Sequence, residues 1–184
     1  MFAALVLFVG YVTFIGIQFA RGFKEYAKAS DSEASVADYK TIRERWFTNG
    51  LVSHFPDAIP DEAKNVKLYY QSAFLQRGAV FQVRFSLPPD EITKTYESAV
   101  LQKTKSFRGG DFGTHVLSPD GLPTTLFYTS GAKPTNGWST FPTDYEVMAF
   151  DSLSTNNLSS SHWKSHGVAI SKTRNEVVYW AEIW

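Results

Sequence analysis

The sequence predicts an α+β protein: an N-terminal transmembrane helix followed by one domain with a mostly antiparallel β-sheet packed by one or two helices. Three observations predict this class. The chain begins with an uncharged apolar run, two later segments have helical periodicity, and several others alternate apolar and polar residues as strands do. Strands that follow one another with the helices kept apart favour an α+β arrangement over a parallel α/β sheet.

Residues 2–20 form the apolar run and contain no Asp, Glu, Lys or Arg. An α-helix of this length rises about 28 Å, close to the roughly 30 Å hydrocarbon core of a bilayer. We therefore expect residues 1–23 to be a transmembrane anchor, with the lipid bilayer as a partner through residues 2–20. The alternative is a cleaved signal peptide with an A-x-A pattern at 27–29, although no basic residue precedes the run.

A juxtamembrane linker, residues 24–34, is expected after the anchor. Arg21, Lys24 and Lys28 follow the apolar run, and this charge bias favours a domain on the cytoplasmic side. Later loops rich in Ser, Thr, Asn and aromatic residues are instead typical of exported domains. The chain has no cysteine, which fits either compartment. The expected localisation is a membrane, crossed once, with the side of the domain left open.

The remaining residues, 35–184, are enough for one globular α+β domain with a proper core. Lys and Arg together number 18, as do Asp and Glu, so the formal net charge is zero. Without a basic field there is no electrostatic footprint for nucleic acid, and we expect no nucleic-acid partner.

A helix is predicted to start at Ser35, because Ser35 and Asp38 have the spacing of a capping box. An apolar stripe then recurs every three to four residues and consists of Val36, Tyr39, Ile42 or Arg43, and Trp46. This stripe fits either packing on the domain or contact with the lipid surface. The mixed charge of the opposite side favours packing on the domain.

Strands are predicted at 66–71 and 81–87, where apolar and polar residues alternate, and residues 72–78 join them as a hairpin. In the second strand, Val83 and Phe85 are expected to be buried beneath the helix that follows. Pro89, Asp90 and Glu91 then open a helix that runs to Thr104 and is expected to lie on the sheet with Ile92, Tyr96 and Val100 inward.

Four more strands are predicted: Thr124–Thr129, Tyr145–Phe150, Gly167–Lys172 and Glu176–Ile183. The last is apolar on both of its faces. It is therefore either a central strand that is covered twice or a strand that exposes its tryptophans for contact. We favour the central strand, since exposed Trp180 and Trp184 on an edge strand would invite aggregation.

Three long loops are predicted between these elements, at 106–123, 130–143 and 152–166. Loops of this length are usually functional or disordered, so a binding site is expected there. They hold the candidate ligand-binding residues, which are charged, imidazole or indole side chains: Arg108, Asp111, His115, Trp138, His162, Trp163 and His166. Within this set, Arg108 to Asp111 reads as a tight turn that can form an anion-binding nest.

No residue pattern identifies a catalytic centre. His162 and His166 have a spacing that suits metal ligands on a helix, but Trp163 stands where the zincin pattern has glutamate, and the segment reads as loop. The sequence has no nucleophile elbow, phosphate loop, dinucleotide fingerprint or cysteine. We assign no catalytic residue and expect no metal site and no cofactor.

The expected function is therefore non-catalytic binding of a partner protein or small ligand at the membrane surface, with a membrane protein as one candidate partner. Two alternatives stay open at this point. The chain could be a structural subunit of a larger membrane complex, or a hydrolase-type enzyme with a site built from the His and Asp residues of the loops.

Overall fold

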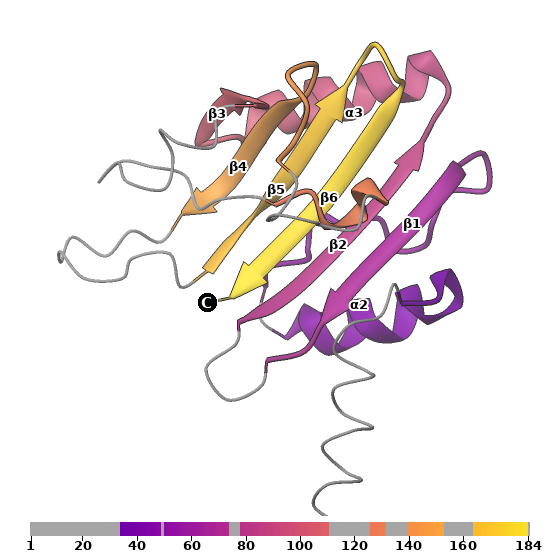
Figure 1. Cartoon of the computed structure of the whole chain (residues 1–184), viewed down its shortest axis with the longest axis vertical. Coiled ribbons are helices and arrows are strands. Elements are labelled where there is room, and N and C mark those ends of the chain that lie inside the picture. Colours follow the sequence, from indigo (N-terminus) through magenta and orange to yellow (C-terminus); the bar gives the residue numbers. More distant parts are fainter. Residues whose placement is uncertain are drawn as a thin grey trace, which may run out of the picture. The chain divides into compact units, whose positions relative to one another are not determined.

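The α+β class is confirmed by the computed structural model of the chain, which describes residues 34–48, 50–73, 78–110, 126–131, 140–152 and 164–183. In these residues six strands form one antiparallel sheet, and two α-helices pack against it (Figure 1). The predicted helix at 2–20 lies outside the described residues. Among the residues that are described, no helix has the length and apolar character needed to cross a membrane.

The helices are α2 (Tyr39–Phe47) and α3 (Pro89–Gln102), with short 3₁₀ turns η1 (Val36–Asp38) and η2 (Tyr128–Ser130). The strands are β1 (Lys64–Gln71), β2 (Ala79–Ser86), β3 (Lys105–Arg108), β4 (Glu146–Ser152), β5 (Lys164–Ser171) and β6 (Glu176–Ile183). Their order across the sheet is β1-β2-β6-β5-β4-β3, so β1 and β3 are its edges.

Strand β6 lies in the middle of the sheet, paired with β2 on one side and β5 on the other. Its residues alternate between two separate cores, because neighbouring residues of a strand face opposite sides. Val177 and Ala181 belong to one core, and Val178 and Trp180 belong to the other. The prediction of a central strand covered on both faces is confirmed for the described residues.

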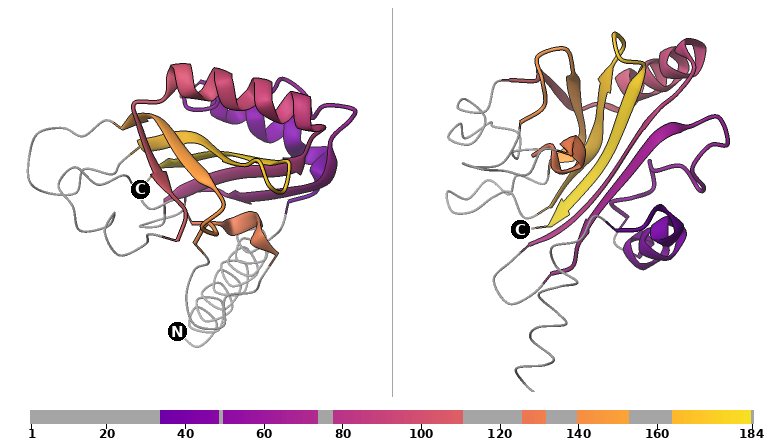
Figure 2. Two further views of the ribbon diagram at one scale, coloured as in Figure 1. Left: turned by 90° about the horizontal axis from the view of Figure 1, so that it is seen from above. Right: turned by 45° about the vertical axis from the view of Figure 1, so that its right-hand side comes forward.

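Both α-helices cover the same face of the sheet, as the left view of Figure 2 shows. The core between them and the sheet contains Tyr39, Ile42 and Trp46 of α2 and Ile92 of α3. The predicted stripe of the first helix is thus confirmed except at Val36, which is 40% exposed. Ser35 caps η1 by accepting a hydrogen bond from the Ala37 amide at 3.3 Å.

The opposite face carries a second core, in which Phe127, Phe141 and Tyr145 pack on Val178 and Trp180. Phe127 and Phe141 stack with their ring centroids 4.7 Å apart.

The prediction of a strand at Thr124–Thr129 is wrong for the residues described there. Leu126 makes only an isolated bridge with Thr140, and the chain then turns into η2. The reason is the buried Gln82 of β2, whose amide nitrogen donates to the Leu126 carbonyl and whose amide oxygen accepts from the Thr129 main chain, both at 2.9 Å. These tertiary bonds occupy main-chain groups that a strand would use in a ladder.

Two predicted loop boundaries are also wrong. β3 occupies Lys105–Arg108, where the sequence predicted the end of a helix and the start of a long loop. β5 begins at Lys164, so His166 lies in a strand and not in a loop. Both segments mix polar and apolar residues, and their pairing with β4 makes them strands.

Phe85 is fully buried in the same core as Ile92 and Ala99, as the alternation of its strand predicted. Replacing Phe85 with Ala should lower the free energy of unfolding by about 3–5 kcal/mol, because the cavity left in this core cannot collapse completely. Urea denaturation of the full-length chain would measure the change. Leu101→Ala is the control, because Leu101 is 87% exposed and should change stability little. Equal midpoints for the two variants would contradict the packing described for Phe85.

Candidate functional site

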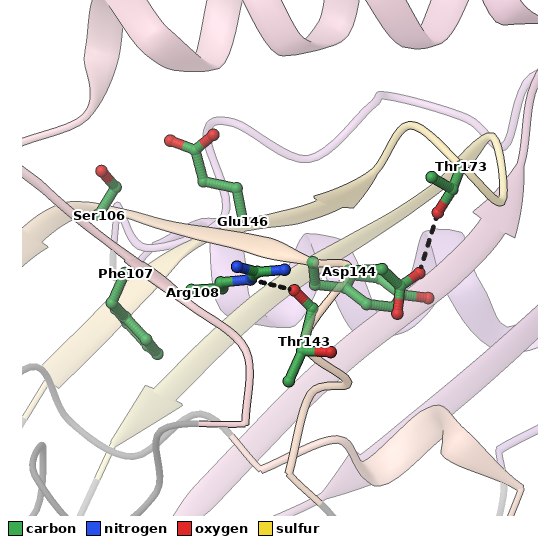
Figure 3. Close-up of a pocket in the computed structure, with 8 residues that line it drawn as sticks. Ser106, Phe107, Arg108, Thr143, Asp144, Glu146 and Thr173 are labelled. Atoms are coloured by element: carbon green, nitrogen blue, oxygen red, sulfur yellow. Dashed lines mark hydrogen bonds between the residues drawn. The ribbon is translucent and has the colours of Figure 1, made fainter.

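A hollow of about 540 Å³ lies where β3 ends at the edge of the sheet (Figure 3). Three segments line it: β3, the residues leading into β4, and the turn between β5 and β6. The lining residues are Ser106, Phe107, Arg108, Thr143, Asp144, Tyr145, Glu146 and Thr173.

Two glycines end β3 and bring its last residue, Arg108, against the segment before β4. Any Cβ on Gly109 would fall on the carbonyl oxygen of Pro142, so this close approach requires glycine. Gly110 has a φ of 89°, a left-handed conformation that side chains disfavour. The Gly109 amide donates to the Tyr145 carbonyl at 2.9 Å and ties the two segments together.

Asp144 is held by donors from the end of β5 and from the turn that follows it. Its carboxylate accepts hydrogen bonds from Arg174 Nε at 2.7 Å and Nη2 at 3.0 Å, and from the Ser171 hydroxyl at 2.7 Å. The Thr173 hydroxyl also donates to it at 3.2 Å. The Arg174 hydrogen bonds, helped by that of Ser171, lower the pKa of Asp144 to about 2. Asp144 is therefore a carboxylate at neutral pH whose acceptor capacity is already used.

Glu146 is bound by residues of α3 and of the segment that follows it. It accepts hydrogen bonds from the Tyr96 hydroxyl at 2.8 Å and from Lys103 Nζ at 3.0 Å. Burial alone would raise the pKa of Glu146, but the bonds from Lys103 and Tyr96 outweigh it and lower the pKa below its usual value. In Figure 3 the Glu146 carboxylate points toward α3 and away from Arg108.

A buried pair of polar side chains, Tyr145 and Glu176, lies next to the hollow. Tyr145 donates a hydrogen bond to Glu176 of β6, and Arg84 of β2 lies 3.7 Å from the same carboxylate. Burial raises the pKa of Glu176, and the charge of Arg84 offsets part of this rise. The Arg174 guanidinium lies 5.6 Å from the centroid of the Tyr145 ring. These contacts connect the hollow to the central strand.

Arg108 differs from the other charged residues of the hollow. Its Nε donates to the Thr143 carbonyl at 2.7 Å, which orients the guanidinium, and the side chain is exposed. Asp144 is paired with Arg174, and Glu146 with Lys103. Among the described residues, Arg108 itself forms no ion pair. An oriented guanidinium of this kind suits a carboxylate, which it can bind through two parallel hydrogen bonds.

The structure places only two of the predicted site residues. Arg108 lines the hollow, whereas His166 lies on β5 four residues from Ile170, the β5 partner of Glu146. Four residues of a strand span about 13 Å, so the structure does not bring Arg108 and His166 together. The remaining candidates, Asp111, His115, Trp138, His162 and Trp163, lie outside the described residues.

His166 packs instead beside His54, with ring centroids 5.2 Å apart, on the helix-covered face of the sheet. His54 Nε2 lies 2.9 Å from the Gly167 carbonyl oxygen, so this nitrogen carries the proton. Burial, together with the neighbouring His166, lowers the pKa of His54 to about 3. His54 also borders a smaller hollow of about 290 Å³ beneath α3. In the part of the chain that is described, no three metal-ligating side chains cluster.

Asp144 and Glu146, which line the hollow with Arg108, are not among the site residues that the sequence predicts. The two acids lie near Arg108 because of the register in which β3 pairs with β4, and β3 itself was not predicted. The pairing of Arg108 with Glu146 across these strands is visible only in the fold. Comparison of the chain with models of protein families, with characterised proteins and with solved structures finds no match.

The bonds to Asp144 make a pH-dependent contribution to stability. Its pKa falls from 3.8 to about 2 on folding, so this contribution is complete above pH 4 and is lost as the pH falls toward 2. Asp144→Asn should lower the free energy of unfolding by about 1 kcal/mol at pH 7, since the pair is partly exposed, and by much less at pH 2. Denaturation at both pH values would measure this difference. Asp61→Asn, at an exposed site, is the control; an equal loss at both pH values would argue against the ionic contribution.

Proposed function

We propose that this chain is a single-pass membrane protein whose α+β domain binds, without catalysis, a carboxylate-bearing partner protein or small ligand at the membrane surface. The observation that carries the proposal is Arg108, an oriented guanidinium in a hollow where each carboxylate is already paired with its own cation. A ligand carboxylate would supply the missing negative charge. Its second contact surface would be the apolar part of the lining, which Phe107 provides.

Binding is favoured over catalysis by the state of the two acids. A general base works best with a pKa near the working pH, whereas Asp144 has a pKa of about 2 and uses its oxygens to bind Arg174, Ser171 and Thr173. Glu146 is likewise bound by Tyr96 and Lys103. Neither acid is arranged to activate a hydroxyl group or a water molecule.

Attachment to the membrane is supported by the sequence of residues 2–20, whose length and lack of charge suit a bilayer-spanning helix. The anchor would hold the domain at the membrane surface, where a partner anchored in the same bilayer meets it at a raised effective concentration.

Arg108→Ala should weaken binding of an acidic peptide by about tenfold or more, because a hydrogen bond to a charged group contributes about 1.5–3 kcal/mol. Isothermal titration with the full-length chain in detergent micelles and a capped peptide containing one glutamate would measure the affinity. Arg108→Lys should bind with intermediate affinity, since it keeps the charge but loses the planar fork.

The matched control is Arg45→Ala, which removes the same charge from an exposed position near the end of α2. This variant should bind the peptide as the original chain does. Equal affinities for Arg108→Ala and Arg45→Ala would contradict a carboxylate site in the hollow.

Replacing Val9 or Phe14 with Arg should impair membrane insertion, because a charge at the centre of a spanning helix costs about 2.5–3.5 kcal/mol on insertion scales. Alkaline extraction of cell membranes followed by immunoblotting would measure retention. Val9→Leu and Phe14→Leu are the controls and should be retained fully. If both Arg variants also stayed in the membrane fraction, residues 2–20 would not be the anchor.

A further inference from the structure

We infer that the occupant of the hollow is an extended polypeptide segment that adds to the sheet as a strand beside β3 and places an acidic side chain opposite Arg108. This inference rests on the proposed function, since it specifies the partner of the same site. It draws on three further observations: the position of β3, the direction of its main-chain groups and the face on which Arg108 lies.

β3 is an edge of the sheet. It pairs with β4 on one side, and no strand of the described residues lies beyond it on the other (Figure 1). An edge strand presents main-chain donors and acceptors that an extended peptide can pair with. The hollow lies along this same edge, because all of Ser106–Arg108 line it.

The hydrogen-bonding pattern shows which groups of β3 point outward. The Gly109 amide bonds to the Tyr145 carbonyl of the adjacent segment, in register with the β3–β4 pairing. Antiparallel ladders alternate, so the Phe107 main chain also points toward β4, whereas the amides and carbonyls of Ser106 and Arg108 point away from it. Ser106 and Arg108 are thus two successive outward positions of β3 that pair with no strand of the described residues.

The side chain of Arg108 lies on the face that an opposing acidic residue would share. A residue paired directly with Arg108 would exchange both main-chain hydrogen bonds with it and place its own Cβ about 5.5 Å away. That distance suits a glutamate reaching the guanidinium. The neighbouring positions of the incoming strand would lie on the same side as Phe107, which is the side of the second core, so apolar residues are expected there. The geometry therefore selects an acidic residue flanked by apolar ones.

The other edge, β1, is less suited to this role. Asn65 has a left-handed φ of 55°, and the β1–β2 register shifts between Lys64 and Lys67. Irregularities of this kind protect an edge from further pairing. By contrast, β3 pairs with β4 without a register shift from Lys105 to Arg108.

The test uses the full-length chain in detergent micelles and the peptide Ac-Thr-Val-Glu-Val-Thr-NH2. Ser106→Pro removes the outward amide of β3 without removing a bond to β4, and should weaken peptide binding by about tenfold or more. Ser106→Val loses the same hydroxyl group but keeps the amide, and should bind within about twofold of the original chain. Glutarate, which has no peptide main chain, should bind all three proteins equally.

A second measurement does not depend on the folding of any variant. N-methylation of the peptide's Glu should weaken binding to the original chain by about tenfold or more, because that amide pairs with Arg108. N-methylation of either Val should have little effect, because those amides point away from β3.

The outcomes separate the two proposals. If N-methyl-Glu peptide and Ser106→Pro both bind normally while Arg108→Ala still weakens binding, the strand addition is wrong and the carboxylate site stands. If neither the peptide nor glutarate depends on Arg108, the proposed function is wrong as well.

Discussion

The fold depends on burying both faces of β6. The strand has apolar residues on each side, so it is stable only in the centre of a sheet that is covered twice. The helices α2 and α3 cover one side, and the segments around Phe127 and Phe141 cover the other. Gln82 holds that second cover in place, because its buried amide is satisfied by the Leu126 carbonyl and by the main-chain amide and the hydroxyl group of Thr129.

The hollow is positioned by the same central strand. The turn between β5 and β6 supplies Thr173 and Arg174, and these residues hold Asp144 in the segment that leads into β4. Glu176, the first residue of β6, accepts a hydrogen bond from the Tyr145 hydroxyl group. Arg108 is then positioned by the segment that precedes β4, through the Thr143 carbonyl and the close contact of Gly109 with Pro142. The last residue of this short edge strand is thereby held by the neighbouring segment.

The charged residues of the hollow differ in whether they form ion pairs. Asp144 and Glu146 are each committed to a cation and to hydroxyl groups, which gives them a structural task. Arg108 has a main-chain acceptor but no ion pair among the described residues. Zero net charge overall is compatible with the proposed anion-binding position at Arg108, because salt screens charges that lie more than a Debye length apart.

The sequence by itself determined the strands and helices whose apolar residues have a clear period. The alternation in β2 placed Val83 and Phe85 correctly, and the two apolar faces of β6 predicted its central position. Only the tertiary structure decided β3, η2 and the strand position of His166. Their residues have no strong period, and pairing with β4 or bonds from Gln82 select the conformation. The site shares this origin, because Arg108, Asp144 and Thr173 come from separate segments that meet only through the register of the sheet.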